Sequence, residues 1–355
     1  MQPHFLPWHT ELARKWLGDK DRFAHAWLIH GLAGIGKREF AFAAAASLLC
    51  ETPIQGLACG HCLACGWVAR GNHPDLKRIR PEAVAAEEGI DLGAEDDSGI
   101  SDEKTAAETG SSTKRAPSKD IRVEQIRGLE PWFNHATHRG GWRVALIYPA
   151  EALTTISGNT LLKVLEEPPP STIFLLVADG PDRLLPTLLS RCRRLPLATP
   201  SDEIAQQWLQ SKGVQQPSTW LAAAGGAPLL AKQLSETESS ACPEWITEFL
   251  ATLDSKHHID VGALADRLTK FNANVWLDAL QRLSVDLNLC AHGLPCRYYL
   301  AQQSRLSQIS LHGDVVQFSQ LASWLNEQKR VASHPLNAKL FAQAVLQRLI
   351  NVCKF

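Results

Sequence analysis

The sequence has no stretch of about 20 consecutive apolar residues, the length that a helix needs to cross a bilayer. Its first residues, MQPHFLPWHTELARKW, lack the basic-then-apolar pattern that directs secretion, so we expect a cytoplasmic protein with no membrane partner. The net charge is also nearly zero, at −1 from 36 Lys and Arg against 37 Asp and Glu. This balance excludes a histone-like polycation and a polyacidic tail protein.

The charge is unevenly distributed along the chain. Residues 82–120 contain eleven acidic and four basic residues and no aromatic residue. A segment so poor in apolar side chains cannot bury enough surface to offset its ordering entropy, so we predict a mobile acidic insertion, mostly unstructured. The insertion carries −7, and the remaining chain is therefore mildly basic.

Short apolar runs alternate with helical patterns as far as Pro200. We predict strands at 26–30, 143–148, 172–177 and 194–197, and helices at 37–50, 121–137, 154–167 and 184–191. Strands separated by helices indicate an α/β domain with a parallel sheet that is covered on both faces. After Pro200 the patterns are helical throughout. The 355 residues thus divide into an α/β domain at 1–200, a small helical domain at 201–240 and a larger one at 241–355.

A phosphate-loop motif follows the first predicted strand and opens the next helix. The segment GLAGIGK contains Gly31, Gly34, Gly36 and Lys37 and matches the template G-x-x-x-x-G-K. In such a loop the glycines let backbone N–H groups surround phosphates, and the lysine reaches the terminal phosphates. We therefore predict a nucleotide-binding architecture, with two alternatives open: weak nucleotide binding, or a retained structural turn.

The residues that would hold Mg²⁺ beside this loop are missing. The template has Ser or Thr after the lysine, whereas Arg38 stands there and has no acceptor atom. Tyr148 takes the place of the acidic residue expected at the end of a later strand, and Glu151 alone would be a weak metal site. We predict that ATP binding is degenerate or absent and that the chain hydrolyses ATP poorly or not at all.

Four of the nine cysteines have the spacing of a metal site. Cys50, Cys59, Cys62 and Cys65 form C-x8-C-x2-C-x2-C, in which close pairs can bind one tetrahedral ion through two thiolates. Four thiolates leave no open position for a substrate, so we predict structural Zn²⁺ rather than a redox or catalytic centre. The spacing alone also admits an iron–sulfur cluster.

Two further segments complete a pattern that resembles a known family. NTLLKVLEEPP occupies residues 159–169, and Ser190, Arg191 and Cys192 follow it. Together with the phosphate loop and the cysteine cluster, this order resembles the clamp-loader subunits of bacterial DNA polymerase III over residues 20–80 and 121–235. The resemblance implies an AAA+ P-loop domain, a helical lid and a C-terminal all-α collar domain for oligomerisation. It also implies partners: motor subunits (gamma or tau) and delta in a hetero-pentameric ring, the beta sliding clamp, and primer-template DNA.

The departures from the motor subunits are typical of the family's non-hydrolysing stator member. Besides Arg38 and Tyr148, the lid segment AGGAPLL at 224–230 lacks the arginine with which motor subunits sense nucleotide. In the family, the arginine of the Ser-Arg-Cys segment projects into a neighbour's ATP site. The resemblance therefore implies that Arg191, beside Ser190, is an arginine finger acting in trans.

The enzymatic status follows from the same resemblance. The chain would be a subunit of a DNA-directed DNA polymerase, a nucleotidyltransferase, with no polymerase activity and little or no ATPase activity of its own. Two alternatives stay open. One is an active AAA+ clamp-loader ATPase that tolerates Arg38. The other is a zinc-dependent DNA-binding module, which explains the cysteines but not the phosphate loop.

Overall fold

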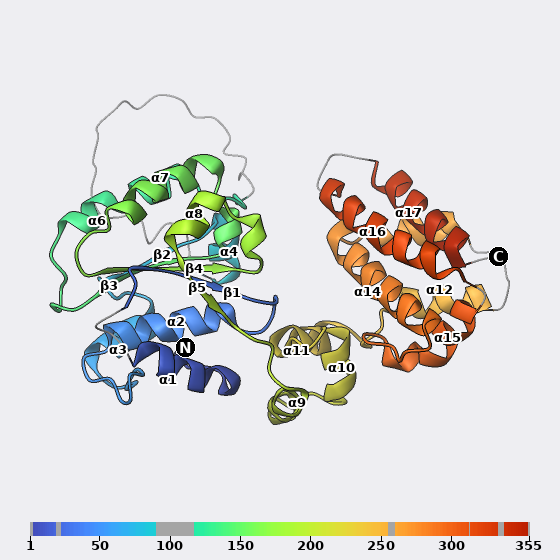
Figure 1. Ribbon diagram of the computed structural model, residues 1–355, viewed down its shortest axis with the longest axis horizontal. Helices are drawn as coiled ribbons and strands as arrows, with labels where there is room; N and C mark the ends of the chain where they lie inside the picture. Colours follow the sequence, from blue (N-terminus) through green and yellow to red (C-terminus); the bar gives the residue numbers. More distant parts are fainter. Residues whose placement is uncertain are drawn as a thin grey trace, which may run out of the picture. The chain divides into compact units, whose positions relative to one another are not determined.

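The computed structural model describes residues 3–18, 23–89, 117–254, 260–311, 313–332 and 337–353. The chain forms two compact units, Met1–Thr199 and Pro200–Phe355 (Figure 1). The boundary between them lies next to the predicted end of the α/β domain, whereas a division of the second unit at residue 240 stays a prediction. Within the described ranges, no helix is long and apolar enough to cross a membrane.

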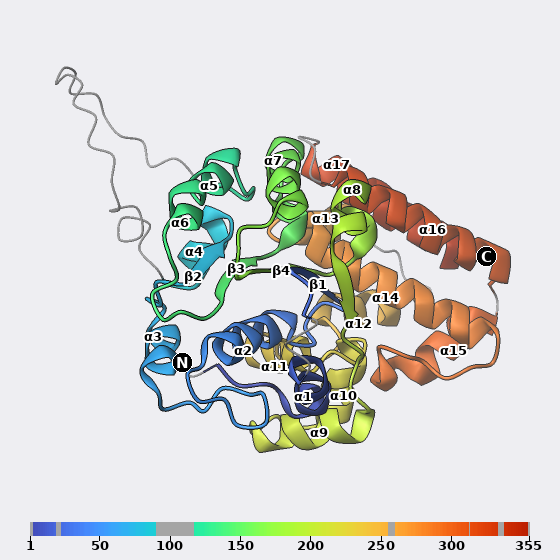
Figure 2. The same ribbon diagram turned by 60° about the vertical axis from the view of Figure 1, so that its left-hand side comes forward.

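The first unit contains a parallel five-stranded sheet with helices on both faces (Figures 1 and 2). Its strands lie in the order β2-β3-β4-β1-β5. They are β1 (Ala26–His30), β2 (Leu76–Ile79), β3 (Arg143–Ile147), β4 (Thr172–Ala178) and β5 (Arg193–Pro196). Every residue of β3 and β4 is buried, which explains why these central strands are almost continuously apolar. The predicted parallel α/β sheet is thus confirmed.

The helices of the first unit form a layer on each face of the sheet (Figures 1 and 2). The helices of this unit are η1 (Pro7–His9), α1 (Thr10–Leu17), α2 (Lys37–Leu49), α3 (Leu63–Arg70), α4 (Glu82–Glu87), α5 (Val123–Arg127), α6 (Glu130–Asn134), η2 (Ala150–Ala152), α7 (Thr155–Glu166), η3 (Pro181–Arg183) and α8 (Pro186–Arg191). Figure 1 shows α1, α2 and α3 on one face and α6, α7 and α8 on the other. Leu28, Phe174, Leu161 and Leu188 share one buried core on the second face.

Two of the differences from the predicted elements before Pro200 have a cause that is visible in the sequence. The predicted helix at 121–137 is two short helices: α5 ends at the C-cap Gly128, and Pro131, which has no N–H to continue the ladder, lies in the first turn of α6. Strand β2 was not predicted at all, since Lys77 and Arg78 interrupt its apolar pattern. They are tolerated because β2 is an edge strand, with only its first and last residues buried.

The predicted acidic insertion is described only at its two ends. Glu82–Glu87 forms α4, and Glu82 accepts a hydrogen bond from the Ser118 backbone N–H at 2.8 Å. The Ala83 N–H donates to Ser118 O at 3.0 Å, so the two ends of the insertion are held together. Residues 90–116, to which the prediction of a mobile segment mainly applies, lie outside the described residues.

The second unit is helical over the ranges that the structure describes, as predicted. Its elements are α9 (Asp202–Ser211), α10 (Pro217–Ala223), α11 (Pro228–Thr237), α12 (Glu244–Asp254), α13 (Val261–Leu268), α14 (Ala273–Ala291), η4 (Leu300–Gln302), α15 (Gln303–Leu311), α16 (Val315–Val331) and α17 (Ala338–Cys353). The long helix α14 packs against α15 and α16 and places Leu280, Leu283 and Leu287 in the core.

Candidate functional site

The phosphate loop connects β1 to α2, as its sequence predicts. Gly34 and Gly36 have φ of 79° and 95°, in the left-handed region that glycine favours. Gly31 lies so close to the neighbouring chain that an added Cβ would be 2.5 Å from Leu197 O. Gly36 is the N-cap of α2. Because glycine has no side chain, it offers no side-chain acceptor to the N–H groups of the first turn. The loop thus has the glycine conformations that its motif predicts.

The lysine of the loop is engaged by the protein itself. The Lys37 side chain is only 6% exposed, and its ammonium donates to Leu32 O at 2.7 Å. The ammonium also pairs with the Asp179 carboxylate at 2.7 Å, and Asp179 directly follows β4. Two of the three ammonium donors are thus directed to partners of the same chain.

The place of the missing magnesium ligands is taken by a cluster of charged side chains around Glu88. The Glu88 carboxylate lies 3.5 Å from the Arg38 guanidinium and 3.0 Å from that of Arg80. The Tyr148 hydroxyl donates to the two Glu88 oxygens at 2.9 and 3.0 Å. Burial raises the pKa of Tyr148 well above its usual range, so the phenol keeps its proton and acts as a donor.

Glu151 supports the turn after β4. One of its oxygens accepts hydrogen bonds from the N–H groups of Asp179 and Gly180, the latter at 3.2 Å. Sequence reasoning missed both Asp179 and Glu88. Asp179 had a signal, because it lies at the carboxyl end of a parallel strand, where side chains converge on ligand sites. Glu88 had none, because it belongs to the segment predicted as mostly unstructured.

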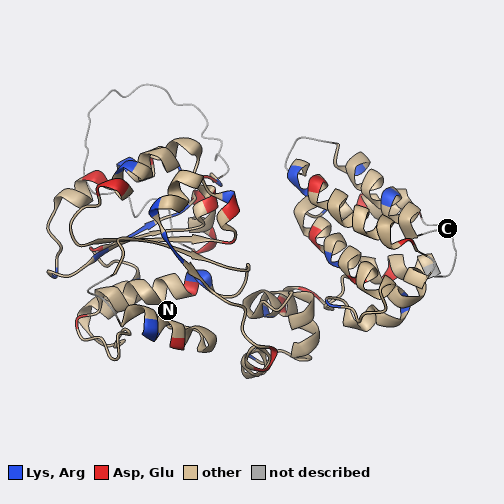
Figure 3. Cartoon of the chain, viewed as in Figure 1, with Lys and Arg blue, Asp and Glu red and all other residues tan. Residues whose placement is uncertain are grey.

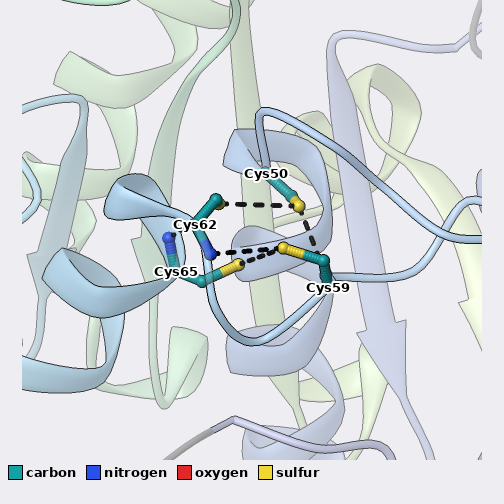
Figure 4. Close-up of side chains that lie close together, drawn as sticks. All are labelled: Cys50, Cys59, Cys62 and Cys65. Atoms are coloured by element: carbon teal, nitrogen blue, oxygen red, sulfur yellow. Dashed lines mark hydrogen bonds between the residues drawn. The ribbon is translucent and has the colours of Figure 1, made fainter.

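The four predicted cysteine ligands come together beside α2 and α3 (Figure 4). Their sulfur atoms all lie within 4.8 Å of one another, with Cys50 to Cys62 at 3.9 Å and Cys59 to Cys65 at 4.0 Å. Four sulfurs placed 2.3 Å from one ion at tetrahedral angles would be about 3.8 Å apart. The cluster is therefore able to hold one tetrahedral metal ion, and the observed spacing is too long for disulfides.

Backbone donors prepare the cluster for thiolates. The N–H groups of Cys59, Cys62 and Cys65 point at sulfur atoms of the preceding ligands at 3.3–3.4 Å. The Thr52 hydroxyl donates to Cys59 Sγ and, with backbone N–H groups, lowers the pKa of Cys59 to about 5. Burial raises the pKa of Cys50, for which a bound cation would favour the thiolate.

Arg191 ends α8 and is held by contacts within its own unit. Its side chain is 34% exposed and pairs with Glu166 at the end of α7. Its guanidinium also donates to Thr187 O at 3.1 Å and to the Ser190 hydroxyl at 3.3 Å. Cys192 is buried beneath, where burial raises its pKa to about 11. Arg191 is thus presented at the surface while Ser190 and Cys192 anchor its segment.

Basic residues lie on both edge strands of the sheet, β2 and β5 (Figure 3). Lys77 and Arg78 lie on β2, and Arg193 and Arg194 lie on β5 directly after the Ser-Arg-Cys segment. Arg193 is positioned over the Trp27 ring at 5.5 Å, which holds its guanidinium in place.

Comparison with known proteins identifies the family. A family model described as DNA polymerase III, delta subunit, matches residues 11–201, which is more than half of the chain. The DNA polymerase III subunit delta' of Pseudomonas aeruginosa is 36% identical over 232 residues, which are 64% of this chain and 60% of that protein. The chain thus spans about three fifths of the length of this relative.

Two further proteins extend the comparison. Subunit delta' of Yersinia pestis is 31% identical over 298 residues, covering 78% of this chain and 77% of the relative. A solved DNA polymerase III gamma subunit-related protein from Thermotoga maritima covers 97% of this chain and 99% of its own, with 15% identity and a TM-score of 0.45, too distant to bear on function. The sequence matches show that the chain belongs to the delta prime family of DNA polymerase III clamp-loader subunits.

Proposed function

We propose that this chain is a non-hydrolysing stator subunit of the DNA polymerase III clamp loader. The observation that carries the proposal is the cluster at Glu88. Arg38 and Tyr148 stand where the loop's magnesium ligands belong, and both contact the same carboxylate. Without Mg²⁺, the charge that develops on a transferring phosphoryl group is not neutralised, which typically raises the barrier by several kcal/mol.

Arg191 gives such a subunit a catalytic role at a neighbour's site. A guanidinium is always charged, and its planar fork matches a γ-phosphate. Arg191 is partly exposed, and its partner Glu166 is half-exposed, so the guanidinium can exchange this carboxylate for a phosphate at low cost. Ser190, which donates to Thr187 O at 2.9 Å, keeps the segment in place during that exchange. The chain would then hydrolyse no ATP itself, and the neighbouring motor subunit would still need this chain to hydrolyse ATP.

The remaining assignments follow from the family. We propose that the chain joins gamma or tau motor subunits and delta in a hetero-pentameric ring that loads the beta clamp onto primer-template DNA. The arginines of β5 suit contacts with DNA phosphates, which position a protein without reading sequence. The metal of the cysteine cluster is proposed to be Zn²⁺ in a structural role, because four thiolates around a tetrahedral ion leave no position for a reactant.

The test uses a clamp loader reconstituted with motor and delta subunits. Arg191→Ala should lower single-turnover ATP hydrolysis at the site facing this subunit by about 10³, and Arg191→Lys should rescue little because it lacks the fork. Arg183→Ala, which removes another arginine just before α8, serves as the matched control and should leave the rate unchanged.

Two results would contradict the proposal. One is an unchanged ATPase rate in the loader that contains Arg191→Ala. The other is Mg²⁺-dependent ATP turnover by the isolated wild-type chain at the rate of a motor subunit, which would support the active-ATPase alternative instead.

A further inference from the structure

The phosphate loop combines two features that do not belong to the same function. Its backbone keeps the glycine conformations and the uncapped helix start that bind phosphate. Its lysine, however, is 6% exposed and already paired with a carboxylate at 2.7 Å. The loop thus has the backbone that its motif specifies, although its lysine is already engaged.

We infer that Asp179 is the resident anion of the phosphate loop, an autoinhibitory contact that holds Lys37 and keeps the triphosphate of a nucleotide out. The inference deepens the proposed function, on which it depends, by naming the side chain that closes the loop. Phosphate binding is then suppressed by one removable carboxylate, whereas hydrolysis is lost separately through Arg38 and Tyr148.

The position of Asp179 is fixed by the fold. The residue follows β4, which pairs with β1, and β1 leads directly into the phosphate loop. Glu151 holds the backbone of this turn by accepting from the N–H groups of Asp179 and Gly180. The carboxylate is therefore held next to Lys37 by the sheet itself and not by a flexible surface segment.

Charge explains why the contact opposes a nucleotide. The Lys37 ammonium is mostly shielded from water, so the Asp179 carboxylate compensates much of its charge. A triphosphate would have to displace Asp179, and the displaced carboxylate, 52% exposed at the same turn, would then repel it. The next residue along the helix, Arg38, is already shared between Glu39 and Glu88.

The inference is tested by binding of ATP and of inorganic tripolyphosphate to the full-length chain without Mg²⁺, measured by calorimetry. Asp179→Asn keeps the size of the side chain and removes its charge. It should bind both ligands at least about tenfold more tightly than the detection limit at which the wild type shows no binding, a change equivalent to about 1.4 kcal/mol or more. Adding Mg²⁺ should produce no hydrolysis, because the cluster at Glu88 is intact.

Matched variants separate this contact from a general change of charge. Asp182→Asn removes an exposed carboxylate three residues further on and should bind no more tightly than the wild type. The double variant Lys37→Ala with Asp179→Asn should lose the gain. The inference is overturned if Asp179→Asn binds no better than Asp182→Asn, or if its gain survives the loss of Lys37.

A measurement on the wild type keeps the test independent of whether the variant folds. Acetylation of Lys37 by an amine reagent, followed by mass spectrometry, should not be slowed by millimolar tripolyphosphate, because the anion does not reach the lysine. Protection of wild-type Lys37 by tripolyphosphate would refute the contact as a block. A failure of the proposed function would be recognised differently, as ATP turnover in the presence of Mg²⁺.

Discussion

The cysteine cluster and the phosphate loop both have a clear sequence motif, but only the cysteine motif contains all the side chains that meet at its site. The four cysteines converge to within 4.8 Å with no foreign side chain needed to complete the set. In the phosphate loop, the two cations Lys37 and Arg38 are taken by Asp179 and Glu88, which come from outside the motif. A motif that contains all its ligands can be interpreted locally, whereas one whose partners come from other strands cannot.

The largest effect should come from breaking the cysteine cluster. Cys59→Ser, or removal of the metal by a chelator, should lower the free energy of unfolding of the first unit by on the order of 5 kcal/mol, because metal binding is coupled to the folding of residues 50–65. Metal content and unfolding are measured on the same sample. Cys353→Ser, at the end of α17, is the control and should keep the metal. Full metal content in Cys59→Ser would contradict the assignment.

The next effect concerns the carboxylate at the centre of the loop-side cluster. Glu88→Gln should destabilise the first unit by about 3 kcal/mol, because it removes the charge of the carboxylate that pairs with the Arg80 guanidinium, only 3% exposed. Chemical denaturation measures the change. Glu87→Gln, on the exposed last residue of α4 directly before Glu88, should change stability little. Equal effects of the two variants would show that the cluster is only a surface feature.

The third prediction concerns the pH dependence of stability, to which His9 should contribute. His9 packs its ring against Phe40, and burial, with the charge of Lys37, lowers the pKa of His9 to about 4. In the unfolded chain His9 takes up a proton near pH 6.5, whereas in the folded chain it resists until about pH 4. Stability should therefore fall by about 2 kcal/mol as the pH drops through this window.

The measurement is the free energy of unfolding against pH for the wild type and for His9→Phe. Phenylalanine preserves the aromatic packing and cannot titrate, so the variant should lack this part of the pH dependence. Identical slopes between pH 6.5 and pH 4 in the two proteins would contradict the role of His9.

The smallest effect should follow the loss of one hydroxyl. Tyr148→Phe removes the hydrogen bonds to Glu88 and should cost about 1 kcal/mol of stability, measured by denaturation. Glu88 keeps its contact with Arg80, which limits the loss. The variant should gain no ATPase activity, because phenylalanine is no metal ligand. A gain of activity would mean that Tyr148 blocks an otherwise complete site.

Much of the first unit could be predicted from the sequence, for reasons visible in particular elements. Strands β1, β3 and β4 are buried on both faces, so their sequences are apolar runs that need no knowledge of their neighbours. Strand β2 escaped prediction because its edge position accepts Lys77 and Arg78. Helix α4 escaped because its composition resembles that of the rest of the acidic segment.

The sequence by itself determined the parallel α/β domain, the helical second unit, the four-cysteine cluster and the family, because periodicity, spacing and motif order are properties of the chain. Only the tertiary structure decided what the phosphate loop meets. Asp179 lies far from Lys37 in sequence, and only the pairing of β4 with β1 brings the two charges to 2.7 Å. Glu88 likewise meets Arg38 and Tyr148 only after folding. Coulomb interactions depend on distance in space, which residue spacing along the chain does not report.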